Sequence, residues 1–256
     1  MRILVVDDDA FSRKLMGLYL KPIGVELQLL PGGQECLTAV AEQQPDLILM
    51  DCQMPELDGF ETTRRLRSSG FAGVILALTG NSDDETLRKC TEAGMNGHIS
   101  KPVDATTLRG RIAAALPQML NAEAESPTPA AAEPPPSPPA SEDPLARARK
   151  IAEAARNPAI LARLVDAFVK SAQESMNALE AALQSQDGQA VAAAAHKLRG
   201  SAGSFGATSF SQAAGGLEDA LQSQSLQESS SLIETVRGLW PALRQHLVNN
   251  SGGTTP

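Results

Sequence analysis

An acidic residue directly follows a short apolar stretch in the segment PDLILMDCQMPELDG, residues 45–59. Leu47–Met50 is predicted to be a buried strand, and Asp51 comes at its C-terminal end. A Met-Pro pair and a Leu-Asp-Gly turn then end the strand, because proline has no amide hydrogen and glycine tolerates positive φ. This places a carboxylate at the edge where open α/β sheets bind their ligands.

Other predicted strand ends also carry polar residues. Asp7 and Asp8 end the first strand, Thr79 ends the fourth, and Lys101 followed by Pro102 ends the fifth. In a doubly wound sheet these ends meet at one edge. Because three carboxylates at one edge repel one another, the site needs a cation, and hard oxygen ligands suit Mg²⁺ or Mn²⁺. Such an arrangement fits a phosphate acceptor.

The simpler explanation for these carboxylates is a solvated acidic loop. It accounts well for Asp9, Asp83 and Asp84, but it does not explain a threonine and a lysine at matching strand ends. We therefore favour the phosphate-accepting site.

A histidine is the candidate reactive residue of the second half, in AAAAHKLRGSAGSFGA. At 100° per residue, His196 points about 140° away from the apolar stripe of its predicted helix, toward solvent. Gly200 and Gly203 lie near the same face, although each glycine within a helix costs about 1 kcal/mol relative to alanine. We infer a clearing for a docking partner, with Lys197 and Arg199 available to neutralise phosphate. The stripe consists of Val191, Ala195, Leu198, Ala202 and Phe205.

A lone histidine is more often an ordinary surface or core residue, and this alternative stays open for His196. His246 lacks a comparable clearing, so we interpret it as a charge near a helix C-terminus.

The elements that position the polar residues at the strand ends lie within residues 1–120, where short strands alternate with amphipathic helices. This pattern predicts an α/β fold, a doubly wound five-stranded parallel sheet of the flavodoxin type. The predicted strands are Ile3–Val6, Glu26–Leu30, Leu47–Met50, Val74–Leu78 and His98–Ser100. The predicted helices are Phe11–Leu20, Gln34–Gln43, Phe60–Ser69, Asp84–Ala93 and Thr106–Leu116.

The remainder divides into a linker, a helical domain and a tail. Residues 121–144 are rich in Pro, Ala and Glu and predict an extended spacer, and residues 251–256 are expected to be disordered. Residues 145–250 show helical periodicity and predict a separate all-α antiparallel bundle. Its predicted helices include Gly188–Ser204, Ser209–Gln222 and Ser230–Val248. An earlier helix has a buried stripe of Leu161, Leu164, Val165, Phe168, Ala172, Met176, Leu179 and Leu183.

The composition of this 256-residue chain argues against several classes of function and site. Its net charge of −8 argues against a nucleic-acid partner, which would need clustered Lys and Arg. Cys36, Cys52 and Cys90 form no CxxC pair, so we expect reduced thiols and no disulfide scaffold or zinc site. We find neither a signal peptide nor an apolar run of the roughly 20 residues that a membrane helix needs, and we expect a cytoplasmic protein without membrane contact.

The motifs VVDDD, LMDCQMP with LDG, LTG and SKP resemble the receiver domain of two-component response regulators, over about residues 1–120. The resemblance implies that Asp51 is the phosphoacceptor. It also implies that Asp8, Asp51 and the backbone carbonyl of Gln53 form the metal shell with help from Asp7. Thr79 and Lys101 would then contact phosphoryl oxygens.

Other positions of the receiver pattern have supporting roles. Gly80 adds no side chain beside Thr79, which keeps the approach to Asp51 open. The resemblance implies that Pro102 follows a cis bond that aims Lys101. His98 stands where the family usually has an aromatic switch residue, which departs from the pattern. Gln53 and Asn81 occupy the positions that tune hydrolysis of the acyl phosphate in receiver domains, so the resemblance implies the same role for them here.

The motif HKLRGSAGSFGA resembles histidine phosphotransfer (HPt) domains, over about residues 145–248. The resemblance implies that His196 is the phosphorylated residue. Arg199 replaces the lysine common in the family, and Gly200 matches its small position.

Together the two resemblances imply a phosphorelay intermediate that shuttles phosphate between a histidine kinase and a response regulator. We find no ATP-binding stretch, and we expect neither kinase activity in this chain nor a small-molecule substrate. One alternative is a binding module or phosphate sink that titrates a kinase. Another is a Mg²⁺-dependent phosphatase, although Gln53 stands where such hydrolases favour a second acid.

Overall fold

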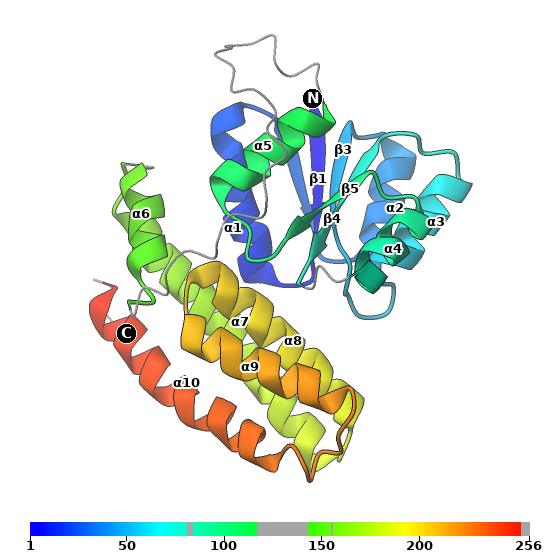
Figure 1. The fold of residues 1–256 in the computed structure, drawn as a ribbon. Helices are drawn as coiled ribbons and strands as arrows, with labels where there is room; N and C mark the ends of the chain where they lie inside the picture. Colours follow the sequence, from blue (N-terminus) through cyan, green and yellow to red (C-terminus); the bar gives the residue numbers. More distant parts are fainter. Residues whose placement is uncertain (81–83, 117–142, 155, 252–256) are drawn as a thin grey trace. The chain divides into compact units, whose positions relative to one another are not determined.

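A computed structural model describes residues 1–80, 84–116, 143–154 and 156–251 (Figure 1). The chain divides into two compact units, Met1–Pro136 and Ser137–Pro256. Most of the proposed linker, all but the first residue of the proposed tail, and Asn81 and Asp83 lie outside the described residues.

The first unit contains a parallel sheet of five strands in the order β2-β1-β3-β4-β5. Its strands are β1 (Arg2–Val6), β2 (Glu26–Leu30), β3 (Leu47–Asp51), β4 (Val74–Thr79) and β5 (Gly97–Ser100). Its helices are α1 (Ala10–Leu20), α2 (Gly33–Glu42), α3 (Gly59–Ser68), α4 (Asp84–Ala93) and α5 (Ala105–Ala115), with the short 3-10 helix η1 (Lys21–Ile23) after α1. The predicted doubly wound α/β fold is confirmed, and its strand and helix bounds agree within one residue.

Helices cover both faces of this sheet. In Figure 1, α1 and α5 lie side by side on one face, and α2, α3 and α4 lie on the other. Every residue of β1 and β3 is consequently buried, as expected for central parallel strands. Val6 pairs with Met50 and Asp51 pairs with Leu78, so the strands end together at one edge.

All the regular secondary structure among the described residues of the second unit is helical. Its helices are α6 (Ala146–Ala154), α7 (Ala159–Gln184), α8 (Gly188–Phe205), α9 (Thr208–Leu221) and α10 (Ser230–Asn250). Helix α8 packs against both α7 and α9, and the successive helices reverse direction (Figure 1). The prediction of an antiparallel bundle is confirmed. Gly206 ends α8 with φ of 107°, a left-handed conformation that glycine adopts without strain.

Aromatic side chains fill the bundle core. The rings of Phe168 and Phe205 stack with centroids 4.3 Å apart, and those of Phe210 and Trp240 stack at 5.6 Å. Trp240 also donates its indole hydrogen to Gln173 Oε1 at 3.1 Å. The predicted stripe of α7 is buried from Leu164 to Leu179, whereas its end residues Leu161 and Leu183 are only half-buried.

The start of the bundle differs in detail from the sequence expectation. Asp143, assigned to the linker, accepts a hydrogen bond from the backbone of Leu145 and pairs with Arg149. It therefore caps α6, a short helix separated from α7 that periodicity did not resolve. None of the described helices is long and apolar enough to cross a bilayer.

Candidate functional site

The structure brings the predicted acidic residues together. Asp7 follows β1 and is fully buried, and Asp51 ends β3 with 4% exposure. Asp7, Asp8 and Asp51 each offer a carboxylate oxygen, and these three oxygens lie within 4.8 Å of one another. Such a set of hard oxygen donors fits a divalent cation such as Mg²⁺.

Lys101 joins the same cluster from the loop after β5. Its Nζ donates to Asp51 Oδ2 at 2.6 Å and to Asp7 Oδ2 at 2.9 Å, and its side chain is 8% exposed. The backbone amide of Lys101 donates to the carbonyl of Thr79 at 2.7 Å, and this bond connects the segment after β5 to the end of β4. Thr79 is buried, and the bond between Lys101 and Pro102 is cis.

Burial makes the charges of this cluster interdependent. It raises the pKa of Asp7 to about 8, an effect that Lys101 opposes and the negative charges of Asp51 and Asp9 reinforce. Burial alone would lower the pKa of Lys101, but the attraction of Asp51 and Asp7 outweighs it and raises that pKa above its ordinary value. One lysine thus faces several carboxylates, and a bound cation would relieve the excess negative charge.

The backbone after Asp51 is anchored on two sides. The Cys52 amide donates to the Leu78 carbonyl at 3.1 Å, and the Gly59 amide donates to the Cys52 carbonyl at 3.0 Å. A Cβ atom at Gly59 would lie only 2.0 Å from the Asp51 carbonyl oxygen. The glycine of the LDG turn therefore lets α3 begin against the strand end that carries Asp51.

Gln53 and His98 occupy the remaining predicted positions. Gln53 is exposed, and its amide lies 3.3 Å from Asp51 Oδ1. His98 is half-buried on β5, where burial and the nearby charge of Arg111 lower the pKa of its imidazole. Both effects favour the uncharged form of the His98 ring.

His196 lies on α8 in a more enclosed setting than the helical wheel predicts. Its Nδ1 lies 2.8 Å from Glu218 Oε1 on α9, and its side chain is 20% exposed. The expectation of a fully solvent-facing histidine was wrong, because the wheel describes one helix and cannot show that α9 packs beside it.

Glu218 also organises Arg199. Arg199 Nη1 lies 3.2 Å from Glu218 Oε2 and 3.4 Å from Asp219 Oδ1. A Cβ atom at Gly215 would lie 3.1 Å from Arg199 Cδ, so this glycine makes room for the arginine stem. Glu218 was not among the predicted site residues, and the signal for it in the sequence is the Gly215-Gly216 pair shortly before Glu218 and Asp219.

The charges around Glu218 favour a carboxylate. Burial opposes the charged form, but hydrogen bonding and attraction from His196 and then Arg199 prevail and lower the pKa of Glu218. A carboxylate beside Nδ1 favours the imidazole tautomer with its proton on that nitrogen. The other nitrogen, Nε2, then keeps its lone pair for nucleophilic attack.

The predicted clearing beside His196 is only partly present. A Cβ atom at Gly200 would meet nothing within 4 Å, so this position is open. The Gly203 carbonyl instead accepts a hydrogen bond from Arg147 Nη1 on α6 at 3.3 Å. His246 Nε2 lies 4.0 Å from Asp143 Oδ1, close to the start of α6.

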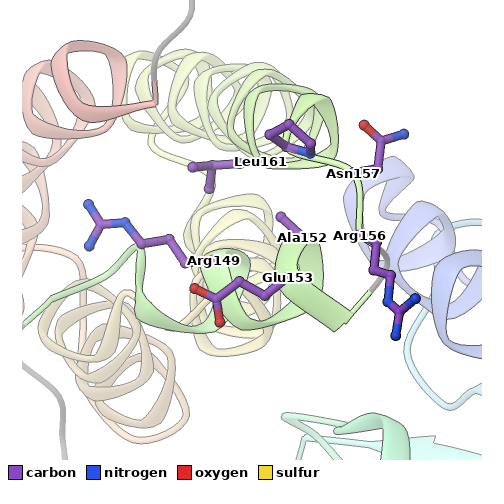
Figure 2. A pocket seen from close by; sticks show the side chains of 7 residues that line it. Arg149, Ala152, Glu153, Arg156, Asn157 and Leu161 are labelled. Carbon is purple, nitrogen blue, oxygen red and sulfur yellow. The ribbon is translucent and has the colours of Figure 1, made fainter.

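A surface pocket of about 310 Å³ lies between α6 and α7 (Figure 2). Arg149 and Arg156 stand at opposite ends of it in Figure 2, with Ala152 and Leu161 between them. None of the predicted site residues lines this pocket. The pocket is therefore not part of either candidate site.

Two family models match the chain, the response regulator receiver domain at residues 3–113 and the Hpt domain at residues 163–246. The chain carries a receiver domain followed by an Hpt domain. Both resemblances drawn from the sequence motifs are thereby confirmed.

Several known proteins are similar to parts of the chain. The sensor histidine kinase RcsC of Salmonella typhimurium is 33% identical over 113 residues, covering 44% of this chain and 12% of RcsC. The osmosensing histidine protein kinase SLN1 of Saccharomyces cerevisiae is 35% identical over 116 residues, covering 43% of this chain and 10% of SLN1. The chain thus spans about a tenth of the length of these relatives.

Among solved structures, the receiver domain of the sensor histidine kinase PA1611 from Pseudomonas aeruginosa is 30% identical. The match covers 45% of this chain and 97% of that structure, with a TM-score of 0.43. That structure holds a magnesium ion coordinated in its active-site cleft.

Proposed function

We propose that the chain is a phosphorelay protein in which Asp51 accepts a phosphoryl group and His196 carries one. One observation carries this proposal: the same chain holds a receiver domain and an Hpt domain, each with a prepared phosphate-accepting side chain. The Asp51 carboxylate is bound by Lys101, and Nδ1 of the His196 imidazole contacts the Glu218 carboxylate. A histidine kinase and a response regulator, as separate proteins, are the proposed partners.

At Asp51, a carboxylate oxygen attacks the phosphorus of a phosphohistidine, and the P–N bond breaks as the P–O bond forms. Asp7, Asp8, Asp51 and the Gln53 carbonyl would hold Mg²⁺ or Mn²⁺, which supplies charge neutralisation for phosphoryl transfer when bound. Lys101 already contacts Asp51 Oδ2, so its ammonium is placed to pair with incoming phosphoryl oxygens. Thr79 would donate a hydrogen bond to one of them.

At His196, Nε2 attacks the phosphorus of an aspartyl phosphate, and the bond between phosphorus and the carboxylate oxygen breaks. The attacking imidazole gains positive charge in this step. The Glu218 carboxylate accepts a hydrogen bond from the Nδ1–H group of His196, which stabilises that charge and orients the ring. Arg199 contacts Glu218, the residue that binds the His196 ring, and also Asp219. If the Arg199 side chain leaves these two carboxylates, its positive charge can compensate the charge of the phosphoryl group on His196.

The test is phosphorylation of the full chain by a small acyl phosphate donor with Mg²⁺, followed by mass spectrometry. We expect one added phosphoryl group on Asp51, none on Asp51→Asn, and normal labelling of Asp84→Asn, an exposed acid at the start of α4. We expect a phosphorylated partner receiver to label His196 but not His196→Gln, with His246→Gln as the matched control. Labelling of Asp51→Asn, or failure of His196 to acquire phosphate from any histidine-kinase or receiver partner of the host, would refute the relay.

A further inference from the structure

Two thiols beside the acidic cluster contact each other. The Sγ atoms of Cys52 and Cys90 lie 3.9 Å apart, and the residues are 3% and 4% exposed. Cys52 directly follows Asp51 and Cys90 lies in α4, so the contact joins two residues that are 38 positions apart in the sequence. All three cysteines of the chain are free, and the third, Cys36, is fully buried in the same core cluster.

The backbones that carry these thiols are held in place. Cys52 is fixed by its hydrogen bonds to Leu78 and Gly59, and the Cys90 carbonyl accepts from the Met95 amide at 3.0 Å. Both side chains belong to the core cluster between the sheet and helices α2, α3 and α4. The proximity of the two sulfurs is therefore set by the packed core and not by a loose loop.

We propose that Cys52 and Cys90 form a site of reversible oxidation, at which a peroxide converts the thiol pair into an intramolecular disulfide. A disulfide bond is about 2.05 Å long, so the two sulfurs must approach further for the bond to form. The bond would tie α4 covalently to the residue next to Asp51.

The reaction balances with a peroxide as the oxidant. One thiol loses its proton and attacks a peroxide oxygen; the O–O bond breaks, and a sulfenic acid and water form. The second thiol attacks the sulfenic sulfur, the S–O bond breaks, and the hydroxyl leaves with the proton as water. Two thiols lose two electrons in total, and hydrogen peroxide is reduced to two water molecules.

The experiment treats the full chain with hydrogen peroxide, denatures it, alkylates the remaining thiols and measures intact mass and peptides. We expect a loss of 2 hydrogen atoms, a crosslinked peptide pair containing Cys52 and Cys90, one alkylated residue at Cys36, and full reversal by dithiothreitol. Alkylation of all three cysteines, separate over-oxidation of Cys52 or Cys90, or a crosslink that involves Cys36 would overturn the proposal.

Variants separate the pair from the third cysteine. We expect Cys36→Ser to retain the crosslink, and Cys90→Ser to lose it. Because a buried hydroxyl can destabilise the core, Cys90→Ala provides a second variant with the same expectation, and the melting temperature of each variant is measured by circular dichroism. A crosslink that persists in a folded Cys90→Ala protein would contradict the assignment.

Discussion

Asp51 and His196 each contact a charged side chain that favours their reaction with a phosphoryl group. For Asp51 the neighbour is the buried ammonium of Lys101, which also contacts Asp7. For His196 it is Glu218, which holds Nδ1 and shares its second oxygen with Arg199. Substitutions that remove the charge of Glu218 or Lys101 but keep a side chain of similar size can separate the electrostatic effect of each contact from its effect on packing.

The Glu218→Gln substitution should slow phosphotransfer to His196 by roughly tenfold to a hundredfold, since a hydrogen bond to a charged group contributes about 1.5–3 kcal/mol. The glutamine amide keeps the shape but loses the charge that stabilises the reacting imidazole. Rapid-quench transfer from a phosphorylated receiver measures the rate, and nitrogen NMR shifts report the His196 tautomer. The matched control is Asp219→Asn, an exposed neighbour that contacts Arg199; an equal effect of both substitutions would contradict a special role of Glu218.

The Lys101→Met substitution should destabilise the receiver domain by about 3–5 kcal/mol, because it leaves buried carboxylates without their cationic partner. We expect millimolar Mg²⁺ to raise the melting temperature of this variant more than that of the wild type. Thermal denaturation with and without the metal measures both effects. Lys89→Met, at an exposed position of α4, is the control and should change little. If Mg²⁺ raises the melting temperature of neither the wild type nor Lys101→Met, the acidic cluster does not bind the metal.

The helices contribute to the sites mainly through where they begin and what lies beside them. Helix α3 starts against the backbone of Asp51 and requires Gly59 for that approach. Helix α9 supplies Glu218 to α8, and α10 is tied to α7 by the hydrogen bond from Arg237 Nε to Glu180 Oε1 at 2.7 Å.

Gly59→Ala should destabilise the receiver and reduce labelling of Asp51, because its added methyl group collides with a backbone carbonyl that cannot rotate away. Gly110→Ala is the matched control: a Cβ atom there meets nothing within 4 Å, and alanine should stabilise α5 by up to about 1 kcal/mol. Urea denaturation gives both free energies of unfolding. Equal stability of the two variants would contradict the close approach of α3.

The ion pair between α7 and α10 should make bundle stability fall in acid. Hydrogen bonding to Arg237 lowers the pKa of Glu180 below the 4.5 of an ordinary glutamate. Its stabilising effect is therefore complete above about pH 4.5 and is lost as the pH falls through the lower folded-state value. Denaturation curves at several pH values should show this loss in the wild type but not in Glu180→Gln.

Glu234→Gln is the control for that experiment, because Glu234 contacts the same arginine from within α10. It should leave the acid dependence due to Glu180 in place. An unchanged pH profile in Glu180→Gln would show that other carboxylates dominate.

The molecule contains two units that each bury a core of their own, one between a sheet and its helices and one among helices. We expect two unfolding transitions. Trp240, the sole tryptophan, lies in the bundle core and should report only the bundle transition. Gly59→Ala should then lower the transition seen by calorimetry for the receiver and leave the Trp240 fluorescence transition unchanged; a shift of both would refute independent unfolding.

Much of this protein could be predicted from local patterns. The apolar strands predict that Asp51 ends β3 and that Asp7 and Lys101 directly follow β1 and β5. Because the strands are parallel, their C-terminal ends lie at one edge of the sheet. The helix around His196 is likewise predicted from the spacing of its apolar residues, because this spacing depends only on the geometry of the helical backbone.

Packing between distant segments decided the rest. The hydrogen bond of His196 to Glu218 depends on α9 lying beside α8, and no helical wheel contains that neighbour. The contact of Cys52 with Cys90 depends in the same way on α4 folding against the end of β3. Sequence spacing fixes which face of an element a residue occupies, whereas side-chain packing across elements fixes what that residue meets, and therefore its charge and its exposure.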